Sequence, residues 1–422
     1  MATDDVAIPT QPVSVGTLLR FLVGSREAIL RVASCRQALW LGLVFVLSTG
    51  FAREYDGADL WHESWHLLLP LAASLGTSFV LYCLVCLAAV PHGVDELRFW
   101  RGYRTLLTLY WFTAPLAWLY AIPVERFLSA GDATAANLWF LAAVSVWRVL
   151  LITRALSVWL NASFVVIFFL VMFFADSVAI ALAFVTPKPI FNIMGGVRLS
   201  EPDQVLVDAV LMVQVFGMMS WLVWLIGAIV ALSVIKKPWT VTAEPAPCRV
   251  SKPLWATATA LVVLGLALLP IGQPEQRRAY TAERLLKSNQ LEAAVNYMSA
   301  FPREAFPPIW DPPPRVGYGE KEPDIMEVLS MMIRYDATRW MGQLYIDKLS
   351  QNPLEAFQDA LPDADTGTAQ FEGLMSAYEK FVPVDSLNRQ QWEELYGIAD
   401  NPKLDLALRK RLTDYLSARE NR

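Results

Sequence analysis

Long apolar runs recur through the first 271 residues of the chain and stop after them. A helix needs about 20 apolar residues to cross a bilayer core of about 30 Å. Seven runs approach or reach that length, at residues 38–52, 65–90, 105–124, 136–152, 155–185, 205–235 and 253–271. The pattern therefore predicts a polytopic bundle of about seven transmembrane helices over residues 38–271.

Two details of these runs carry structural expectations. The first run is short for a span, so the amphipathic segment before it, residues 25–37, is expected to extend it. Residues 1–37 as a whole are expected to form a cytoplasmic N-terminal segment that contains this amphipathic helix. Pro115 stands inside the third run and predicts a kink there.

The remaining residues, 272–422, have the polar and apolar alternation of soluble helices. Apolar residues on either side of Asn289 predict a helical hairpin. Helical patterns resume after Ile325, with breaks expected at Asn352-Pro353, 362–367, 382–385 and Asn401-Pro402. The predicted fold class is therefore all-α: a membrane helix bundle followed by a soluble, all-helical C-terminal domain.

Two short segments of this domain suggest more specific structures. The stretch SNQLEAAVNY resembles the turn between the helices of a tetratricopeptide unit, over a single repeat of about 30 residues. Residues 301–324 are rich in proline and lack helical periodicity, so they are expected to form an extended spacer between two helical halves. A proline-rich ligand for another protein is the alternative.

Composition separates the same two parts of the chain. The chain is 55% hydrophobic and only 18% charged, where a soluble domain has about 25% charged residues. The C-terminal part holds 18 Lys and Arg against 24 Asp and Glu. An acidic domain is a poor fit for nucleic acid or for anionic lipid headgroups, so neither is an expected partner of the domain.

Basic residues alternate between the two sides of the predicted spans. One set of alternate segments holds 13 Lys and Arg, and the other set holds four. The positive-inside rule then predicts a cytoplasmic N-terminus and an extracytoplasmic C-terminus. The segments AREYDGADL and MGGVRLS are similar to loops of bacterial multi-pass proteins of unassigned function, so the expected location is a bacterial inner membrane.

Three charged residues fall inside apolar runs: Arg148, Asp176 and Asp208. Arg154 is expected at the hairpin between the fourth and fifth runs, with Arg148 about one turn inside, so both are interpreted as cytoplasmic anchors. Asp176 and Asp208 are expected near the outer interface. A buried Asp176 bonded to another span would instead favour a transport function, because intramembrane carboxylates mark functional sites.

The sequence HESWH fits the pattern HExxH and resembles the motif of zinc metallopeptidases over five residues. The resemblance implies His62 and His66 as zinc ligands and Glu63 as the general base. A third ligand is missing, since the only other histidine, His92, follows 26 residues after His66. The preferred interpretation is an aromatic belt at the membrane surface, with no metal and no cofactor.

Cys83 and Cys86 form a CxxC pair inside the second apolar run, where thiols are expected to behave as small hydrophobic groups. No nucleotide-binding or hydrolase motif accompanies them. The sequence therefore favours a non-enzymatic membrane anchor or scaffold, embedded in the lipid bilayer, that binds a protein partner through residues 272–422. The alternatives are a transporter or channel subunit using Asp176, Asp208 and Arg148, and a zinc peptidase.

Overall fold

The computed structural model describes residues 12–51, 60, 62–92, 98–122, 124, 127–185, 201–268, 274–308, 310–314, 323–349, 357, 367–387, 389–401 and 404–417. The regular secondary structure of these residues is helical. Over these residues, extended pairing is limited to two isolated bridges. The all-α prediction is confirmed for this part of the chain. Two units separate by their contacts: an apolar unit (1–187 and 201–273) and a tail unit (188–200 and 274–422).

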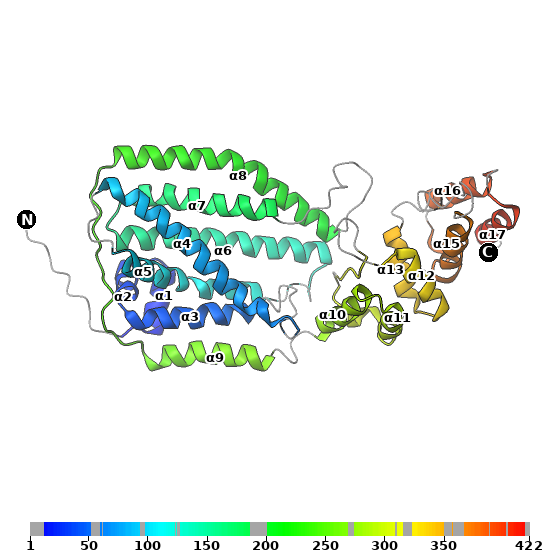
Figure 1. Cartoon of the computed structure of the whole chain (residues 1–422), viewed down its shortest axis with the longest axis horizontal. Coiled ribbons are helices and arrows are strands. Elements are labelled where there is room, and N and C mark those ends of the chain that lie inside the picture. Colours follow the sequence, from blue (N-terminus) through cyan, green and yellow to red (C-terminus); the bar gives the residue numbers. More distant parts are fainter. Residues whose placement is uncertain are drawn as a thin grey trace, which may run out of the picture. The chain divides into compact units, whose positions relative to one another are not determined.

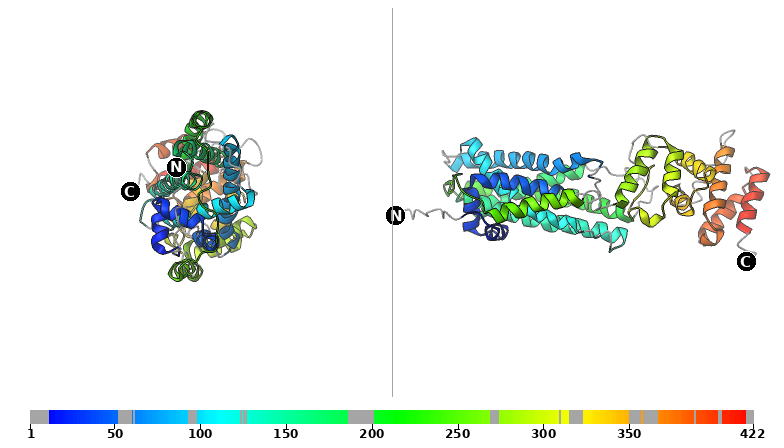
Figure 2. Two further views of the ribbon diagram at one scale, coloured as in Figure 1. Left: turned by 90° about the vertical axis from the view of Figure 1, so that its left-hand side faces the viewer. Right: turned by 90° about the horizontal axis from the view of Figure 1, so that it is seen from below.

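The apolar unit is a bundle in which helices α3, α4, α6, α7, α8 and α9 run roughly parallel to one another in two side views (Figures 1 and 2). Each of the seven predicted runs falls on a helical element. In chain order the elements of the unit are α1 (Val15–Leu22), α2 (Arg26–Ala33), α3 (Arg36–Gly50), η2 (Ser64–Leu68), α4 (Leu69–Ala89), η3 (Val90–His92), α5 (Phe99–Trp111), η4 (Ala114–Ala121), α6 (Ala130–Trp159), α7 (Phe164–Val185), α8 (Glu201–Val234) and α9 (Lys252–Leu268).

Four stretches of this unit are long and apolar enough to cross a membrane: Ser64–Ala89, Gly131–Trp159, Phe164–Val185 and Gln204–Val234. The other three predicted spans are shorter or broken. Helices α3 and α9 have 15 and 17 residues, and α5 ends at Trp111 before the 3₁₀ helix η4. Pro115 explains that break, because a proline ring clashes with the carbonyl four residues before it.

The predicted extension of the first span is wrong. Residues 26–33 form a separate helix, α2, and the chain turns at Ser34 and Cys35 before α3 begins. The backbone at this junction bonds to a distant segment: Ala246 N–H donates to Ser34 C=O at 2.7 Å, and Arg36 N–H donates to Ala246 C=O at 3.2 Å. These groups are therefore not free to continue a helical hydrogen-bond ladder.

The position of the hairpin between the fourth and fifth runs is also corrected. Helix α6 continues to Trp159, and the chain turns at residues 160–163, where Asn161 has a φ of +46°. Arg154 therefore lies inside α6 and not at the hairpin. Its guanidinium donates through Nε to Gly24 C=O at 3.4 Å, at the corner between α1 and α2.

Helix α8 exposes large apolar side chains along its whole described length. These include Leu206, Leu211, Met212, Phe216, Met219, Leu222, Val223, Ile226, Ile229, Val230 and Val234. The outer surfaces of α4, α6 and α7 carry similar residues. Soluble monomers rarely expose contiguous apolar surface on this scale, so the apolar unit has the surface of a protein that associates with a membrane.

The tail unit has its own hydrophobic core. Its elements are α10 (Pro274–Lys287), α11 (Leu291–Ser299), η7 (Arg303–Ala305), α12 (Ile325–Arg334), α13 (Arg339–Leu349), α15 (Gly367–Phe381), η8 (Val384–Ser386), α16 (Arg389–Ala399) and α17 (Leu406–Ser417). The predicted hairpin is confirmed, since α10 and α11 join through Asn289, which has a φ of +58°. Positive φ is tolerated by Asn more readily than by most residues.

The described part of the proline-rich segment packs into the tail core, which corrects the expectation of an extended spacer. Pro312 and Pro313 are buried, and the hydroxyl of Tyr345 donates to Pro313 C=O at 2.6 Å. Lys348 Nζ donates to the carbonyls of Pro312 and Pro314. These two buried prolines are therefore already bound by helix α13 of their own chain; residues 315–322 lie outside the described residues.

Candidate functional site

The HExxH motif does not adopt the geometry that a zinc site requires. Two ligands one turn apart must stand on the same helix. Helix η2 begins at Ser64, so His62 precedes the helix that carries His66. His66 Nε2 and Glu63 Oε2 are 2.9 Å apart, and the His66 ring stacks on Trp65. His62 and His66 therefore do not stand one turn apart on one helix, and no group of three potential metal ligands occurs among the described residues.

Asp176 occupies the middle of α7, twelve residues after its start and nine before its end. At 1.5 Å per residue, the nearer helix end is about 13 Å away. Ser220 of α8 donates its hydroxyl to Asp176 Oδ2 at 2.6 Å. The expectation that Asp176 lies at an interface is therefore wrong: the carboxylate faces a neighbouring helix, because the turn at 160–163 starts α7 later than the hydropathy indicated.

Two further polar contacts join α7 to α8. The indole of Trp221 donates to Ser177 Oγ at 2.8 Å, and the amide of Gln214 donates to Ala183 C=O at 3.0 Å. Gly227 lets the two helices approach closely, since a Cβ there would overlap the Phe169 ring. Interhelical hydrogen bonds and small residues are the usual means of holding helices together in lipid, so this polar ladder is a packing device.

Arg148 lies eleven residues before the end of α6. Its Nε donates to Thr113 Oγ1 at 3.1 Å, and its guanidinium carbon lies 5.2 Å from the centre of the Tyr110 ring. Thr113 is fully buried and stands in the break between α5 and η4. The guanidinium is thus held against a discontinuity in the bundle and not at a helix end.

Arg148 and Asp176 lie at similar depth but face different neighbours. Counted from the turn at 160–163, both are about 16 to 18 Å along their helices. Arg148 contacts α5 and its break, whereas Asp176 contacts α8. Asp208 lies near the start of α8 with its side chain exposed. The structure therefore does not bring the three candidate residues together.

Basic side chains gather at one end of the apolar unit. The helices α3, α5 and α9 begin there and α6 and α8 end there (Figure 1). The exposed basic residues of these ends and of α1 and α2 are Arg20, Arg26, Arg36, Arg98, Arg101, Arg104, Arg154, Lys236, Lys237, Arg249 and Lys252. The two exposed acidic side chains described in the same segments are Glu27 and Glu244, so this end is strongly positive.

A strap of extended chain, residues 235–251, crosses this basic end between α8 and α9. Its Thr240 and Thr242 N–H groups donate to Leu160 and Trp159 at 3.0 and 2.9 Å. Trp239 of the strap stacks on His92 with ring centres 5.1 Å apart. His92 is at the opposite end of α4 from the HExxH motif, as the sequence indicated. The strap therefore ties the ends of four helices to one another.

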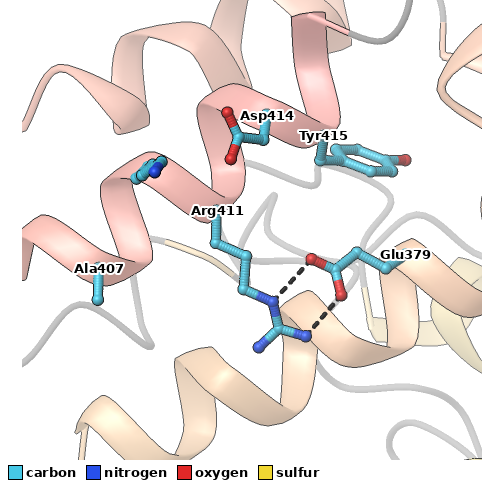
Figure 3. A pocket seen from close by; sticks show the side chains of 6 residues that line it. Glu379, Ala407, Arg411, Asp414 and Tyr415 are labelled. Carbon is cyan, nitrogen blue, oxygen red and sulfur yellow. Dashed lines mark hydrogen bonds and ion pairs between the residues drawn. The ribbon is translucent and has the colours of Figure 1, made fainter.

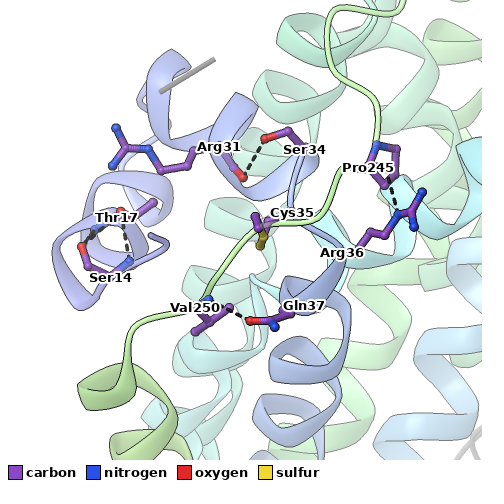
Figure 4. Close-up of a disulfide and its surroundings, with 10 residues drawn as sticks. Ser14, Thr17, Arg31, Ser34, Cys35, Arg36, Gln37, Pro245 and Val250 are labelled. Atoms are coloured by element: carbon purple, nitrogen blue, oxygen red, sulfur yellow. Dashed lines mark hydrogen bonds between the residues drawn. A yellow bond between two sulfur atoms is a disulfide. The ribbon is translucent and has the colours of Figure 1, made fainter. Parts of the chain in front are cut away.

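A disulfide joins Cys35 to Cys248 of the strap, across 213 residues of sequence and 5.2 Å between Cα atoms (Figure 4). Gln37 and Arg36 flank the link: Val250 N–H donates to Gln37 Oε1, and Arg36 Nε donates to Pro245 C=O.

The pairing of Cys35 with Cys248 was not predicted from the sequence. The available signal was weak, namely a cysteine beside a basic cluster at each of two predicted span ends. Cys83 and Cys86 are free thiols.

The tail unit has an open pocket of about 460 Å³ between α15 and α17, lined by Glu379, Ala407, Lys410, Arg411, Asp414 and Tyr415. Arg411 reaches from α17 to Glu379 of α15 with contacts of 2.7 and 2.5 Å, so the pair is bidentate (Figure 3). The hydroxyl of Tyr415 donates to Val382 C=O at 3.0 Å, and burial raises its pKa. Lys410 and Asp414 stay exposed at the rim.

Sequence reasoning did not find this pocket either, because its residues come from two helices about 30 positions apart and form no motif. The comparisons with known proteins add no assignment. No protein-family model, no curated protein and no solved structure matches the chain. Functional inference therefore depends on the geometry described above.

Proposed function

We propose that this protein is an integral membrane anchor that presents its tail unit to a protein partner. The observation that carries the proposal is the separation of two hydrophobic cores, one in the apolar unit and one in the tail. The apolar unit exposes lipid-compatible side chains, whereas the tail encloses its own apolar residues. A domain with a complete core does not need the membrane helices for stability, and this arrangement is typical of a presented binding module.

The proposed topology has seven crossings, with the basic end in the cytoplasm and the tail unit on the other side. The asymmetry of Lys and Arg supports this orientation. The short helices α3 and α9 would cross by local thinning of the bilayer, which costs only fractions of a kcal/mol per Å of mismatch. A bacterial inner membrane is the proposed location.

The pocket between α15 and α17 is the proposed contact for the partner. Its rim offers both a cation, Lys410, and an anion, Asp414, while the Arg411–Glu379 pair fixes the floor. Paired charges of opposite sign favour a polar segment of a partner over an apolar one, because charged rims set specificity and orientation.

Cross-linking of the full chain in its native membrane tests this proposal. The Lys410→Glu variant should lose the cross-linked partner that the wild-type chain retains, since the substitution reverses one charge of the rim. Arg284→Glu makes the same charge change at an exposed site on α10 and should keep the partner. Equal cross-linking by both variants would exclude the pocket as the contact.

A transporter or channel subunit is the second candidate. The depth shared by Arg148 and Asp176 in adjacent helices favours it, since intramembrane charges often line a pathway. The bond from Ser220 of α8 to Asp176 of α7 favours it as well. The anchor stays the first candidate because Arg148 and Asp176 contact different helices and the exposed Asp208 lies near the start of α8, so the three charged residues do not form one path. If membranes that contain the Asp176→Asn variant lost solute flux while the variant kept its fold, the transporter would become the first candidate.

A further inference from the structure

We infer that Arg148 is the centre of an oxyanion-binding site inside the apolar unit. The inference rests on the proposed embedding of this unit in a membrane. The site consists of the Arg148 guanidinium, the Tyr110 ring beneath it and the Thr113 hydroxyl at the break between α5 and η4. The ligand class is an oxyanion of the phosphate type, carried by a lipid headgroup or by a free anion.

Arg148 lacks a countercharge among the described residues. Among the described residues no carboxylate forms an ion pair with Arg148, although it lies in the middle of a helix that has the length and composition of a span. A cation at such a position is costly unless it is paired or hydrated. A cation–π contact and one hydroxyl offset part of that cost, and an anion from outside the chain would offset the rest.

The terminal nitrogens of Arg148 are donors that an oxyanion could use. Among the hydrogen bonds between described residues, the guanidinium uses only Nε, in its bond to Thr113. Both terminal nitrogens have accessible surface, because neither is among the buried polar atoms without a hydrogen-bond partner. Two terminal nitrogens in one plane match two oxygens of one oxyanion, and this bidentate fit is the reason that Arg is favoured at such sites.

The groups beside Arg148 hold its guanidinium in place. Thr113 donates its own hydroxyl to Tyr110 C=O at 2.7 Å, so it is fixed as an acceptor for Arg148. The Tyr110 hydroxyl lies 3.1 Å from Thr77 Oγ1, which itself donates to Ala73 C=O. Tyr110 is therefore the donor in that contact, which fixes the ring 5.2 Å from the guanidinium carbon. Broken helices at mid-membrane depth are where transport proteins build ion sites.

Binding measurements on the purified full-length chain in detergent test the inference. The probes are inorganic phosphate, micelles containing phosphatidylglycerol, and micelles containing phosphatidylcholine as the zwitterionic lipid. Wild-type protein should bind phosphate or phosphatidylglycerol more tightly than phosphatidylcholine. Arg148→Gln should weaken that binding by about tenfold or more, the size expected for hydrogen bonds to a charged group.

Two further variants complete the experiment. Arg104→Gln removes an exposed arginine of α5 and should leave the affinity within about twofold. Arg148→Lys keeps the charge but not the bidentate fork, so it should fold and bind less tightly than wild type even where Arg148→Gln does not fold. Binding of phosphate alone identifies a solute site, and binding of phosphatidylglycerol alone identifies a lipid site.

Absence of binding by the wild-type chain, or equal binding by wild type and Arg148→Gln, would overturn the inference. Loss of binding in Arg104→Gln to the same extent as in Arg148→Gln would also overturn it, since the effect would then be general to positive charge. The assay contains no tail partner, so these outcomes leave the anchor proposal standing.

Discussion

Asp176 and Arg148 are the residues whose roles depend most on one local detail, the place where α6 turns into α7. The apolar run 155–185 contains this turn at residues 160–163, Leu-Asn-Ala-Ser, but the run is apolar enough on both sides of the turn to be taken as one continuous span. Hydropathy therefore located both residues in the correct run but at the wrong depth. The neighbours of each side chain could not be found from sequence, since Ser220 and Thr113 belong to helices distant in the chain.

Ser220→Ala should lower the free energy of unfolding of the apolar unit by about 0.5 to 1.5 kcal/mol, because it removes the interhelical donor to Asp176. Asp176→Asn should change stability less, since the amide oxygen can still accept this bond. Thermal unfolding of the full chain in detergent measures both effects. Ser233→Ala is the matched control, as Ser233 bonds only to Ile229 of its own helix; an equal loss there would contradict the interhelical role.

At the scale of elements, the sequence predicted the helices of the bundle better than their ends. Each apolar run falls on helical elements, and the break near Pro115 was expected from one residue. The separate helix α2 was not expected, because its separation from α3 depends on hydrogen bonds to Ala246, more than 200 residues later. The proline-rich segment was mistaken for a spacer since Tyr345 and Lys348, which bind it, lie beyond it in sequence.

Helices α7 and α8 should be sensitive to any side chain at Gly227. Gly227→Ala places a methyl group on the Phe169 ring, and overpacking of this kind costs about 1 to 3 kcal/mol. Gly76→Ala in α4 is the control, since no atom lies within 4 Å of a Cβ there. A loss of thermal stability in the first variant and none in the second is expected; equal behaviour would show that α7 and α8 do not pack this closely.

The strap gives a chemical test of the proposed orientation. Disulfides do not persist in a reducing cytoplasm, so Cys35 and Cys248 should be free thiols in living cells and should join when the protein is purified in air. Alkylation before and after lysis, read by mass spectrometry, counts the thiols in each state. Four alkylated cysteines in cells and two after aerobic purification are expected. A pair already oxidised in cells would place the basic end outside the cytoplasm.

At the scale of the whole molecule, composition changes near residue 271, and the contacts divide the chain at residue 273. The contacts also group residues 188–200 with the tail unit, which the sequence did not indicate. The surface that binds a partner does not follow from composition. The pocket between α15 and α17 depends on how hairpins stack, and the sequence carries no repeat that would predict it.

Residues 274–422 expressed alone should fold into a helical domain that unfolds cooperatively, because the tail core is made of residues from this range. Circular dichroism during heating measures the transition. Gly342→Ala should destabilise the fragment by about 1 to 3 kcal/mol through overlap with the Phe381 ring, whereas Gly397→Ala, which meets no atom, should not. A broad transition that neither substitution changes would mean that the fragment lacks a fixed core.

The side of the membrane on which the strap and the tail lie can be measured with a reporter. A reporter enzyme that is active only outside the cytoplasm can be fused after Arg422 or inserted in the strap between Lys237 and Pro245. The strap and the tail lie on either side of α9, so a crossing by α9 puts them on opposite sides. The proposed topology predicts activity of the reporter fused after Arg422 and no activity of the reporter inserted in the strap. Activity from both, or from neither, would show that α9 does not cross and would contradict the anchor with an extracytoplasmic tail.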